Sequence, residues 1–347
     1  MKESYLSNRK QRVKIGDLTS ADVQVTYGVP QGSVIGPTLF LIYINPLCSL
    51  KLDHCRIFTF ADDTAMIFYG KTWQDVRTKA EEGLRIATRW LQANILTLNE
   101  SKTKFLTFGT SKATLPEDNF TIKIHGCRDI IAQSCQCTEI ERLHTIKYLG
   151  VLVDETLTWK PHIELIAERV RKLIYIFRYL RQVADSNLIK TVYFALAQSI
   201  LSFCLLAWGG ANKTNMIVIE RAQRALLKVM TFKPYKFSTW ELYTECEVLS
   251  VRKLFILQTI LAQHKKVSYT ASKKYSSRRI KNVCPALRVR TTFIKKFQCF
   301  IGPHLYNKMN KILSINSLNQ YDCKHKIINW LKSLSYDEVE NLFKIVR

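Results

Sequence analysis

The chain has 347 residues, of which 47% are hydrophobic, so a packed core is expected and wholesale disorder is excluded. This length allows two or three domains. The formal net charge of +24 indicates a polyanionic partner, which is nucleic acid or, with less support, an anionic membrane.

Most of the positive charge lies in the second half of the chain. Residues 1–160 carry 20 Lys/Arg and 17 Asp/Glu, a difference of +3, whereas residues 161–347 carry 32 and 11, a difference of +21. Residues 161–347 are therefore expected to bind nucleic acid. Three tyrosines in this region are candidates for stacking on bases: Tyr175, Tyr269 and Tyr275.

The first twelve residues are polar and basic, so no signal peptide is expected. The ten Cys are scattered, which is typical of reduced thiols in a nuclear or cytoplasmic protein. Residues 191–208 lack a formal charge and approach the length of a membrane span, but they include Gln198, Ser199 and Ser202. A buried helix is expected there, and no association with a membrane.

The first 27 residues are expected to form a pair of strands. Apolar and polar residues alternate around Val13 and Ile15, and again around Val23 and Val25. Gly16-Asp17 marks the turn between the two strands.

Residues 28–37 hold three Gly and two Pro, which leaves little side chain along this stretch. The stretch is either an ordinary loop before a helix that Pro37 opens, or a loop where a nucleotide or template base approaches the backbone. In the second case Gln31 and Ser33 offer hydrogen bonds. Pro46 is expected to end or kink the helix.

Residues 56–69 form two short apolar arms around Ala61-Asp62-Asp63-Thr64, which predicts a β-hairpin with two acids at its turn. Adjacent carboxylates repel each other, which raises the free-energy cost of ionising both, and a bound divalent cation removes that cost. Asp62 and Asp63 are therefore candidate ligands for Mg²⁺ or Mn²⁺. The alternative is an ordinary solvated turn, because Asp is common in turns.

The spacing of apolar residues predicts an amphipathic helix over residues 73–91. Residues 96–108 follow as a turn and a strand. Lys102 in this segment is either an ordinary surface lysine or, near a phosphate site, a group that neutralises charge on a leaving pyrophosphate. Further strands are expected at residues 122–124 and 147–153.

From Pro161 onward the pattern becomes helical, with a basic helix over the first twenty residues. Two more helices are expected at about 186–208 and 214–231, a linker at 272–279, and short helices over 284–347. Two groups of Cys and His suggest zinc, but neither has the spacing of a zinc finger, so ordinary thiols are expected. The groups are Cys127, Cys135, Cys137 and His144, and Cys299, His304, Cys323 and His325.

Four segments follow one another in a recognisable order: residues 28–33, 60–63, 99–104, and 148–150 with 159–162. In this order and spacing they resemble the reverse transcriptases of non-LTR (LINE-type) retrotransposons, and jockey-like arthropod elements are the most similar. Residues from about 10 to 230 carry the resemblance. It implies an RNA-directed DNA polymerase that works on an RNA template and a DNA primer by Mg²⁺-dependent nucleotidyl transfer.

The resemblance also implies roles for individual residues. Asp62 would be a Mg²⁺ ligand with Asp63 as its acidic neighbour, and Lys102 would assist the departure of pyrophosphate. The nucleotide and template site would include Gln31, Gly32, Ser33 and Phe60. The primer grip, which holds the primer end, would include Tyr148, Leu149 and Gly150.

Three departures from the family pattern stand out. Phe60 stands where many members have Tyr, and Pro46 stands where an acidic residue is common. The family also has a further catalytic Asp on a strand well upstream of the Gly-Val-Pro-Gln-Gly-Ser loop, but only 27 residues precede Gly28 here. Asp17 and Asp22 lack the expected aromatic strand context, so that Asp and the fingers are expected to be absent, as in an N-terminally truncated member.

The resulting prediction is an α+β fold. Residues 1–160 form a partial polymerase palm, a small antiparallel sheet with flanking helices. Residues 161–270 form a helical, thumb-like region, and residues 271–347 form a basic helical tail. Two functions remain open, a reverse transcriptase family protein and a nucleic-acid-binding remnant without catalysis, and no oligomeric state is predicted.

Overall fold

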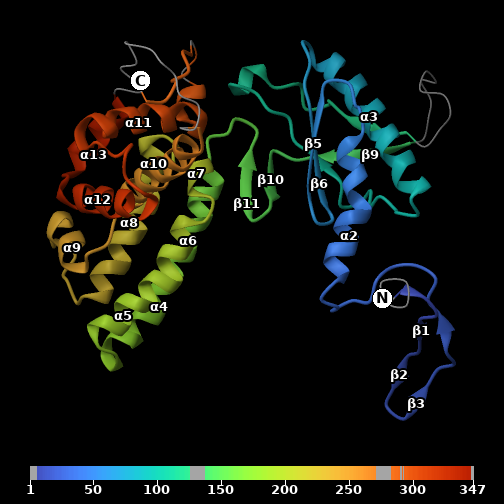
Figure 1. The fold of residues 1–347 in the computed structure, drawn as a ribbon, viewed down its shortest axis with the longest axis horizontal. Coiled ribbons are helices and arrows are strands. Elements are labelled where there is room, and N and C mark those ends of the chain that lie inside the picture. Colours follow the sequence, from blue (N-terminus) through green and yellow to red (C-terminus); the bar gives the residue numbers. More distant parts are fainter. Residues whose placement is uncertain (1–5, 126–136, 271–282, 290, 292, 345–347) are drawn as a thin grey trace. The chain divides into compact units, whose positions relative to one another are not determined.

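The computed structural model describes residues 6–125, 137–270, 283–289, 291 and 293–344 (Figure 1). The chain divides into two compact units: unit 1 comprises residues 1–105 and 116–142, and unit 2 comprises residues 106–115 and 143–347. Both contain helices and small sheets, which confirms the mixed fold class. The assignment of palm, thumb and tail to residues 1–160, 161–270 and 271–347 stays a prediction.

Unit 1 begins with a two-stranded antiparallel arm. β1 (Lys10–Gln11) pairs with β4 (Val23–Gln24), and β2 (Lys14–Ile15) pairs with β3 (Leu18–Thr19). Gly16, between β2 and β3, has φ +57°, a conformation that glycine adopts without steric cost. The predicted strand pair and its turn are therefore confirmed.

The glycine-rich loop leads from this arm into α2 (Gly36–Ile44). Ser33 Oγ donates to the Pro30 carbonyl at 2.8 Å and accepts the Gly36 N–H at 3.1 Å, so its hydroxyl shapes the start of the helix. As predicted, Pro37 lies in the first turn, where its missing N–H costs nothing, and α2 gives way to the 3₁₀ turn η1 (Asn45–Ser49) at Pro46.

The predicted acidic hairpin consists of β5 (Cys55–Phe60) and β6 (Asp63–Phe68), paired antiparallel with Phe60 opposite Asp63. Side chains alternate between two faces. One face is buried with α3 (Trp73–Ala93): Phe68 packs with a cluster that includes Ala80, and Met66 packs with one that includes Ala87. The predicted helix over residues 73–91 is confirmed within two residues at its end.

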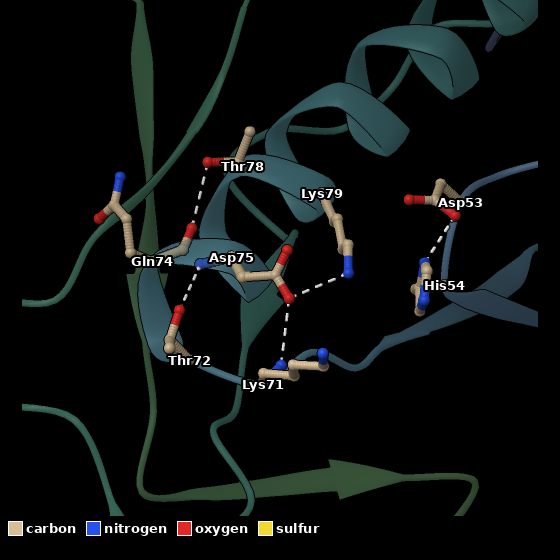
Figure 2. A network of polar contacts seen from close by, with 8 residues as sticks. All are labelled: Asp53, His54, Lys71, Thr72, Gln74, Asp75, Thr78 and Lys79. Atoms are coloured by element: carbon tan, nitrogen blue, oxygen red, sulfur yellow. Dashed lines mark hydrogen bonds and ion pairs between the residues drawn. The ribbon is translucent and has the colours of Figure 1, made fainter.

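Hydrogen bonds at the N-terminal end of α3 fix the point at which this helix begins (Figure 2). The Thr72 hydroxyl accepts the Asp75 N–H at 3.1 Å, and the Asp75 carboxylate accepts the Lys71 N–H at 3.1 Å. Lys79, one turn further on, bonds the same carboxylate at 3.0 Å. The Lys79 ammonium and then the Lys71 N–H lower the pKa of Asp75 below its ordinary value.

A small three-stranded sheet completes unit 1. β9 (Thr138–Arg142) lies between β7 (Lys104–Phe105), which is parallel to it, and β8 (Ile122–Ile124), which is antiparallel. Glu81 of α3 joins helix and sheet, because its carboxylate accepts the Lys123 N–H at 3.1 Å.

Unit 2 contains a second hairpin, β10 (Thr145–Tyr148) and β11 (Val151–Asp154). It packs on α4 (Lys160–Val183) with the rest of the helical unit, although its strand-like sequence continues that of the sheet region. The core of unit 2 lies between α4, α8 (Lys213–Met230) and α10 (Val251–Thr270). The other helices of eight or more residues are α9 (Thr239–Cys246), α11 (Gln298–Leu313), α12 (Gln320–Ser333) and α13 (Tyr336–Lys344).

The helix predicted over residues 186–208 is interrupted. It consists of α5 (Ser186–Val192), the π-helical turn η3 (Tyr193–Gln198), α6 (Ser199–Ser202) and α7 (Leu205–Trp208), with a break at Phe203 and Cys204. Its inner side is buried as expected. In the part of the chain that the structure describes, no helix is long and apolar enough to cross a membrane.

Candidate metal and nucleic-acid site

The two acids lie at the end of the β5–β6 hairpin. Ala61, with φ +53°, and Asp62 form a two-residue turn, and Asp63 is the first residue of β6. Both carboxylates are exposed, and neither has a hydrogen bond or ion pair with a described residue. Their oxygens are therefore open to solvent and to a ligand.

The outer face of the hairpin is open and carries apolar side chains together with Arg56, which lies opposite Ile67. The pairing puts Phe58, Phe60 and Ile67 on the face opposite to α3, with 48%, 64% and 46% of their surfaces exposed. Asp63 shares this face, because it lies directly opposite Phe60. The hairpin therefore combines exposed apolar side chains with carboxylate oxygens at its turn. On the inner face, burial raises the pKa of the Cys55 thiol to about 11.

The two carboxylates supply some, but not all, of the ligands that one hard cation needs. Mg²⁺ prefers oxygen ligands and is commonly held by one or two carboxylates together with substrate phosphates and water. The pair offers such oxygens, but the described residues contain no group of three or more His, Cys, Asp or Glu side chains able to hold a metal ion. Asp62 and Asp63 therefore fit an ion that takes its remaining ligands from a bound nucleotide. Asp22, in the arm, faces Lys10 at 4.0 Å.

The possible zinc ligands are not gathered in the part of the chain that the structure describes. Among the described members, no His and Cys side chains gather into a metal-binding group. Cys127 and Cys135 lie outside the described residues. Cys323 is buried, while Cys299 is exposed.

The other predicted site residues of unit 1 are largely exposed. Gln31 and Gly32 are exposed in the loop before α2. Gly32 has φ +79°, a backbone conformation that residues with a side chain rarely adopt. Ser33 is partly buried and bonded locally. Lys102 is exposed in a turn where its N–H donates to Asn99 Oδ1 at 3.1 Å, and no described carboxylate lies within ion-pair distance of its ammonium group.

The predicted primer-grip residues lie in the turn of the β10–β11 hairpin. Leu149 and Gly150 have φ +45° and +85°, and positive values at both central positions are typical of a tight type I′ turn. Tyr148 pairs with Val151 at its base. These residues belong to unit 2, whereas the acidic turn belongs to unit 1.

Sequence reasoning missed Asp154, which holds the connection between this hairpin and α4. Its carboxylate accepts the Thr158 N–H and the Trp159 N–H, both at 2.8 Å, and the Thr158 hydroxyl at 2.9 Å. An Asp followed by Thr at the second and fourth positions after it is a signal of such a side-chain turn.

His162 anchors the same connection from the first turn of α4. It is fully buried, and its Nδ1 accepts the Leu152 N–H of β11 at 3.3 Å. Its ring packs edge-on against Trp208 with the centroids 5.6 Å apart. Burial, with a smaller contribution from Arg169, lowers its pKa to about 4, so the imidazole is neutral at physiological pH.

Comparison with known proteins supports the likeness stated above. Residues 3–153 match the family model of reverse transcriptase (RNA-dependent DNA polymerase). The chain is 26% identical over 242 residues to a probable RNA-directed DNA polymerase from transposon BS of Drosophila melanogaster, a match that covers 67% of this chain and 25% of that protein. It is 24% identical over 256 residues to the RNA-directed DNA polymerase from mobile element jockey of Drosophila funebris, covering 71% of this chain and 26% of that protein.

A third relative comes from a different group of elements. A Pol polyprotein from the type-1 retrotransposable element R1 2 of Nasonia vitripennis is 26% identical over 189 residues, which are 52% of this chain and 43% of that protein. No solved structure matches the chain. The chain spans about a quarter of the length of the first two relatives. Residues 3–153 thus belong to the reverse transcriptase family, and the relatives that the chain matches are proteins of non-LTR retrotransposons.

Proposed function

We propose that this chain supplies the metal-binding turn and a nucleic-acid-binding helical region of an RNA-directed DNA polymerase. The observation that carries the proposal is the pair of exposed, unpartnered carboxylates at the β5–β6 turn, within the segment that matches the reverse transcriptase family. The substrates would be an RNA template, a DNA primer and nucleoside triphosphates.

The proposal gives each predicted site residue one role. Bound Mg²⁺ would neutralise charge on the phosphates during attack by the primer hydroxyl on the α-phosphate. Asp62 and Asp63 would hold the ion, and the Phe60 ring on the outer face would contact the nucleotide or template. Lys102 would approach the leaving pyrophosphate, and Tyr148, Leu149 and Gly150 would hold the primer end.

The Asp62→Asn variant tests the metal assignment without requiring activity. Titration calorimetry with Mn²⁺, in the presence of a nucleoside triphosphate, should show weaker binding in the variant because one of two carboxylate ligands is lost. Asp118→Asn, which changes an exposed acid in a loop, is the matched control and should bind as the unmodified chain does. Equal Mn²⁺ binding in Asp62→Asn and the unmodified chain would refute the assignment.

The chain alone is expected not to extend a primer. Two-metal phosphoryl transfer needs carboxylates around both ions, and the described residues gather no third ligand beside the pair. The test is primer extension on an RNA template with the purified chain, Mg²⁺ and four nucleotides. Extension that Asp62→Asn abolishes would contradict this expectation, and Asp22 or a second copy of the chain would then complete the site.

Nucleic-acid binding is proposed for unit 2, within residues 161–347, because α4 presents an exposed basic and aromatic stripe. Tyr175 and Tyr179 lie one turn apart with their rings 4.8 Å apart and 64% and 56% of their surfaces exposed. Arg171 and Arg178 flank them, and no described carboxylate lies within 4 Å of either guanidinium. Of the other two candidate tyrosines, Tyr275 lies outside the described residues, and the side chain of Tyr269 is not described.

Salt dependence tests this binding. Affinity for RNA should fall steeply with ionic strength because phosphate contacts release counterions, by about a thousandfold between roughly 50 and 200 mM salt if about six phosphates are contacted. Fluorescence anisotropy with labelled RNA measures this slope. Affinity that does not change with salt would rule out phosphate contacts as the source of binding.

A further inference from the structure

The segment that follows α8 alternates aromatic and basic residues. Residues 231–237, called the aromatic-basic loop below, read Thr-Phe-Lys-Pro-Tyr-Lys-Phe. Phe232 and Tyr235 have 63% and 93% of their surfaces exposed. Two large exposed rings within one short basic segment form a candidate surface for a ligand that has flat rings.

The backbone of the loop is fixed by the end of α8. The Lys233 N–H donates to the Lys228 carbonyl at 2.9 Å, and the Phe232 N–H donates to the Val229 carbonyl at 3.5 Å, which together form a Schellman cap. Phe232 occupies the position that glycine normally takes and has φ +55°. Other non-glycine residues of the chain, such as Glu247 and Ser314, also have positive φ, so backbone strain alone does not single out Phe232.

A cation lies against each ring of the loop. The Arg181 guanidinium lies 4.1 Å from the centre of the Phe232 ring, the Lys228 ammonium 5.4 Å from that of Tyr235, and the Lys233 ammonium 4.4 Å from that of Phe237. Arg181 comes from α4 and is held there by a 2.8 Å bond to the Val229 carbonyl. Each of these rings thus has a positive charge beside it.

The charge around the loop is only partly compensated by acidic side chains. Residues 221–240 contain five Lys or Arg and no Asp or Glu. Lys233 pairs with Glu245 at 2.8 Å, but no described carboxylate lies within 4 Å of the charged groups of Lys228, Lys236 or Arg181. A partner with regularly spaced negative charges and flat rings fits this chemistry, and a nucleic acid has both.

We propose that the aromatic-basic loop binds single-stranded RNA, with bases stacked on Tyr235 and Phe232 and phosphates beside Lys228 and Lys236. A single strand is required because bases in a duplex are already stacked on each other and expose only their edges. RNA is chosen because the proposed function supplies the template as an unpaired RNA strand. The inference rests on that function and adds a specific site to it.

The first test removes the most exposed ring. Tyr235→Ala should weaken binding of a labelled, unstructured 12-nucleotide RNA by about 5- to 100-fold in fluorescence anisotropy, the range expected for one stacked base. Tyr235→Phe keeps the ring and should bind like the unmodified chain. Tyr321→Ala, at another exposed tyrosine, in α12 with 70% of its surface exposed, is the control and should change nothing.

The second test separates binding from folding. Phe232→Gly removes a ring and places glycine at a positive φ, so its melting temperature should be unchanged or raised while RNA binding weakens. A ring that served only the fold would give the opposite result, a lower melting temperature with unchanged affinity, and would overturn the proposal.

Further arms distinguish this site from the general function. Duplex RNA should bind Tyr235→Ala and the unmodified chain equally, because its bases are not free to stack on the ring. Unchanged RNA binding in Tyr235→Ala together with weaker binding in Tyr175→Ala would refute the loop site and leave nucleic-acid binding by unit 2 intact. RNA binding that is unchanged in both Tyr235→Ala and Tyr175→Ala would refute both the loop site and the binding stripe on α4.

Discussion

At the scale of single residues, some residues next to a predicted site stabilise the structure that carries the site. The Asp154 and His162 side chains bond backbone groups of Leu152, Thr158 and Trp159, and so they hold the strand and the helix next to the 148–150 turn. The sequence motif at residues 159–162 includes His162 without separating a supporting role from a chemical one, and no motif includes Asp154. Here burial separates them, because His162 is fully buried whereas Asp62 is exposed.

His162 predicts a dependence of stability on pH. Its pKa is about 4 in the folded chain and near 6.5 when unfolded, so between these values the unfolded chain binds a proton that the folded chain does not. The free energy of unfolding should therefore fall as the pH drops from 6.5 to 4, by about 3 kcal/mol from this group, and the contribution should level off below 4.

The measurement is urea unfolding at several pH values, followed by tryptophan fluorescence. In His162→Asn, whose amide oxygen replaces Nδ1 as an acceptor for the Leu152 N–H, this part of the slope should vanish. A slope that is identical in both chains would mean that His162 does not titrate on unfolding.

At the scale of elements, the turn of the β10–β11 hairpin depends on Gly150. Gly150→Ala should cost about 1 kcal/mol or more, because φ is +85° and the new Cβ would lie 3.2 Å from Phe203 Cε1. Leu149→Asn is the contrasting change, since Asn tolerates the positive φ at that position, and it should be neutral or stabilising. Equal unfolding midpoints for Gly150→Ala and the unmodified chain would contradict the turn geometry.

The start of α3 gives a second prediction at this scale. Thr72→Ala removes the cap in Figure 2 and should lower the free energy of unfolding of unit 1 by about 1 kcal/mol. Thr78→Ala is the control, because the Thr78 hydroxyl bonds only the Gln74 carbonyl within the helix, and its effect should be small. Urea unfolding compares the two variants, and equal losses would mean that the cap contributes nothing.

Elements with a strong local pattern were predictable from sequence. Alternating apolar residues predicted β5 and β6, and apolar residues spaced three or four apart predicted α3. These patterns arise because each element buries one face against a neighbour. The break in residues 186–208 was not predictable. Periodicity cannot detect a π-helical turn, and the backbone reversal at Cys204 (φ +48°) depends on packing from distant parts of unit 2.

At the scale of the whole molecule, the positive charge that the sequence concentrates in residues 161–347 reaches the surface of unit 2. The +21 charge difference of residues 161–347 agrees with the exposed basic stripe on α4 and with the aromatic-basic loop. The β10–β11 hairpin nonetheless packs with the helical unit, although its sequence reads as part of the sheet region. Membership of a unit is decided by contacts far apart in sequence, which a local pattern does not contain.

The location of a bound metal is the most direct test of the central claim, that the β5–β6 turn is the metal site of a reverse transcriptase. Fe²⁺ can replace Mg²⁺ and, with ascorbate and peroxide, cleaves the backbone beside the place where it binds. With a nucleoside triphosphate present, we predict cleavage within residues 60–64, suppressed by excess Mg²⁺ and absent in Asp62→Asn. Cleavage confined to other segments, or unchanged in Asp62→Asn, would contradict the claim.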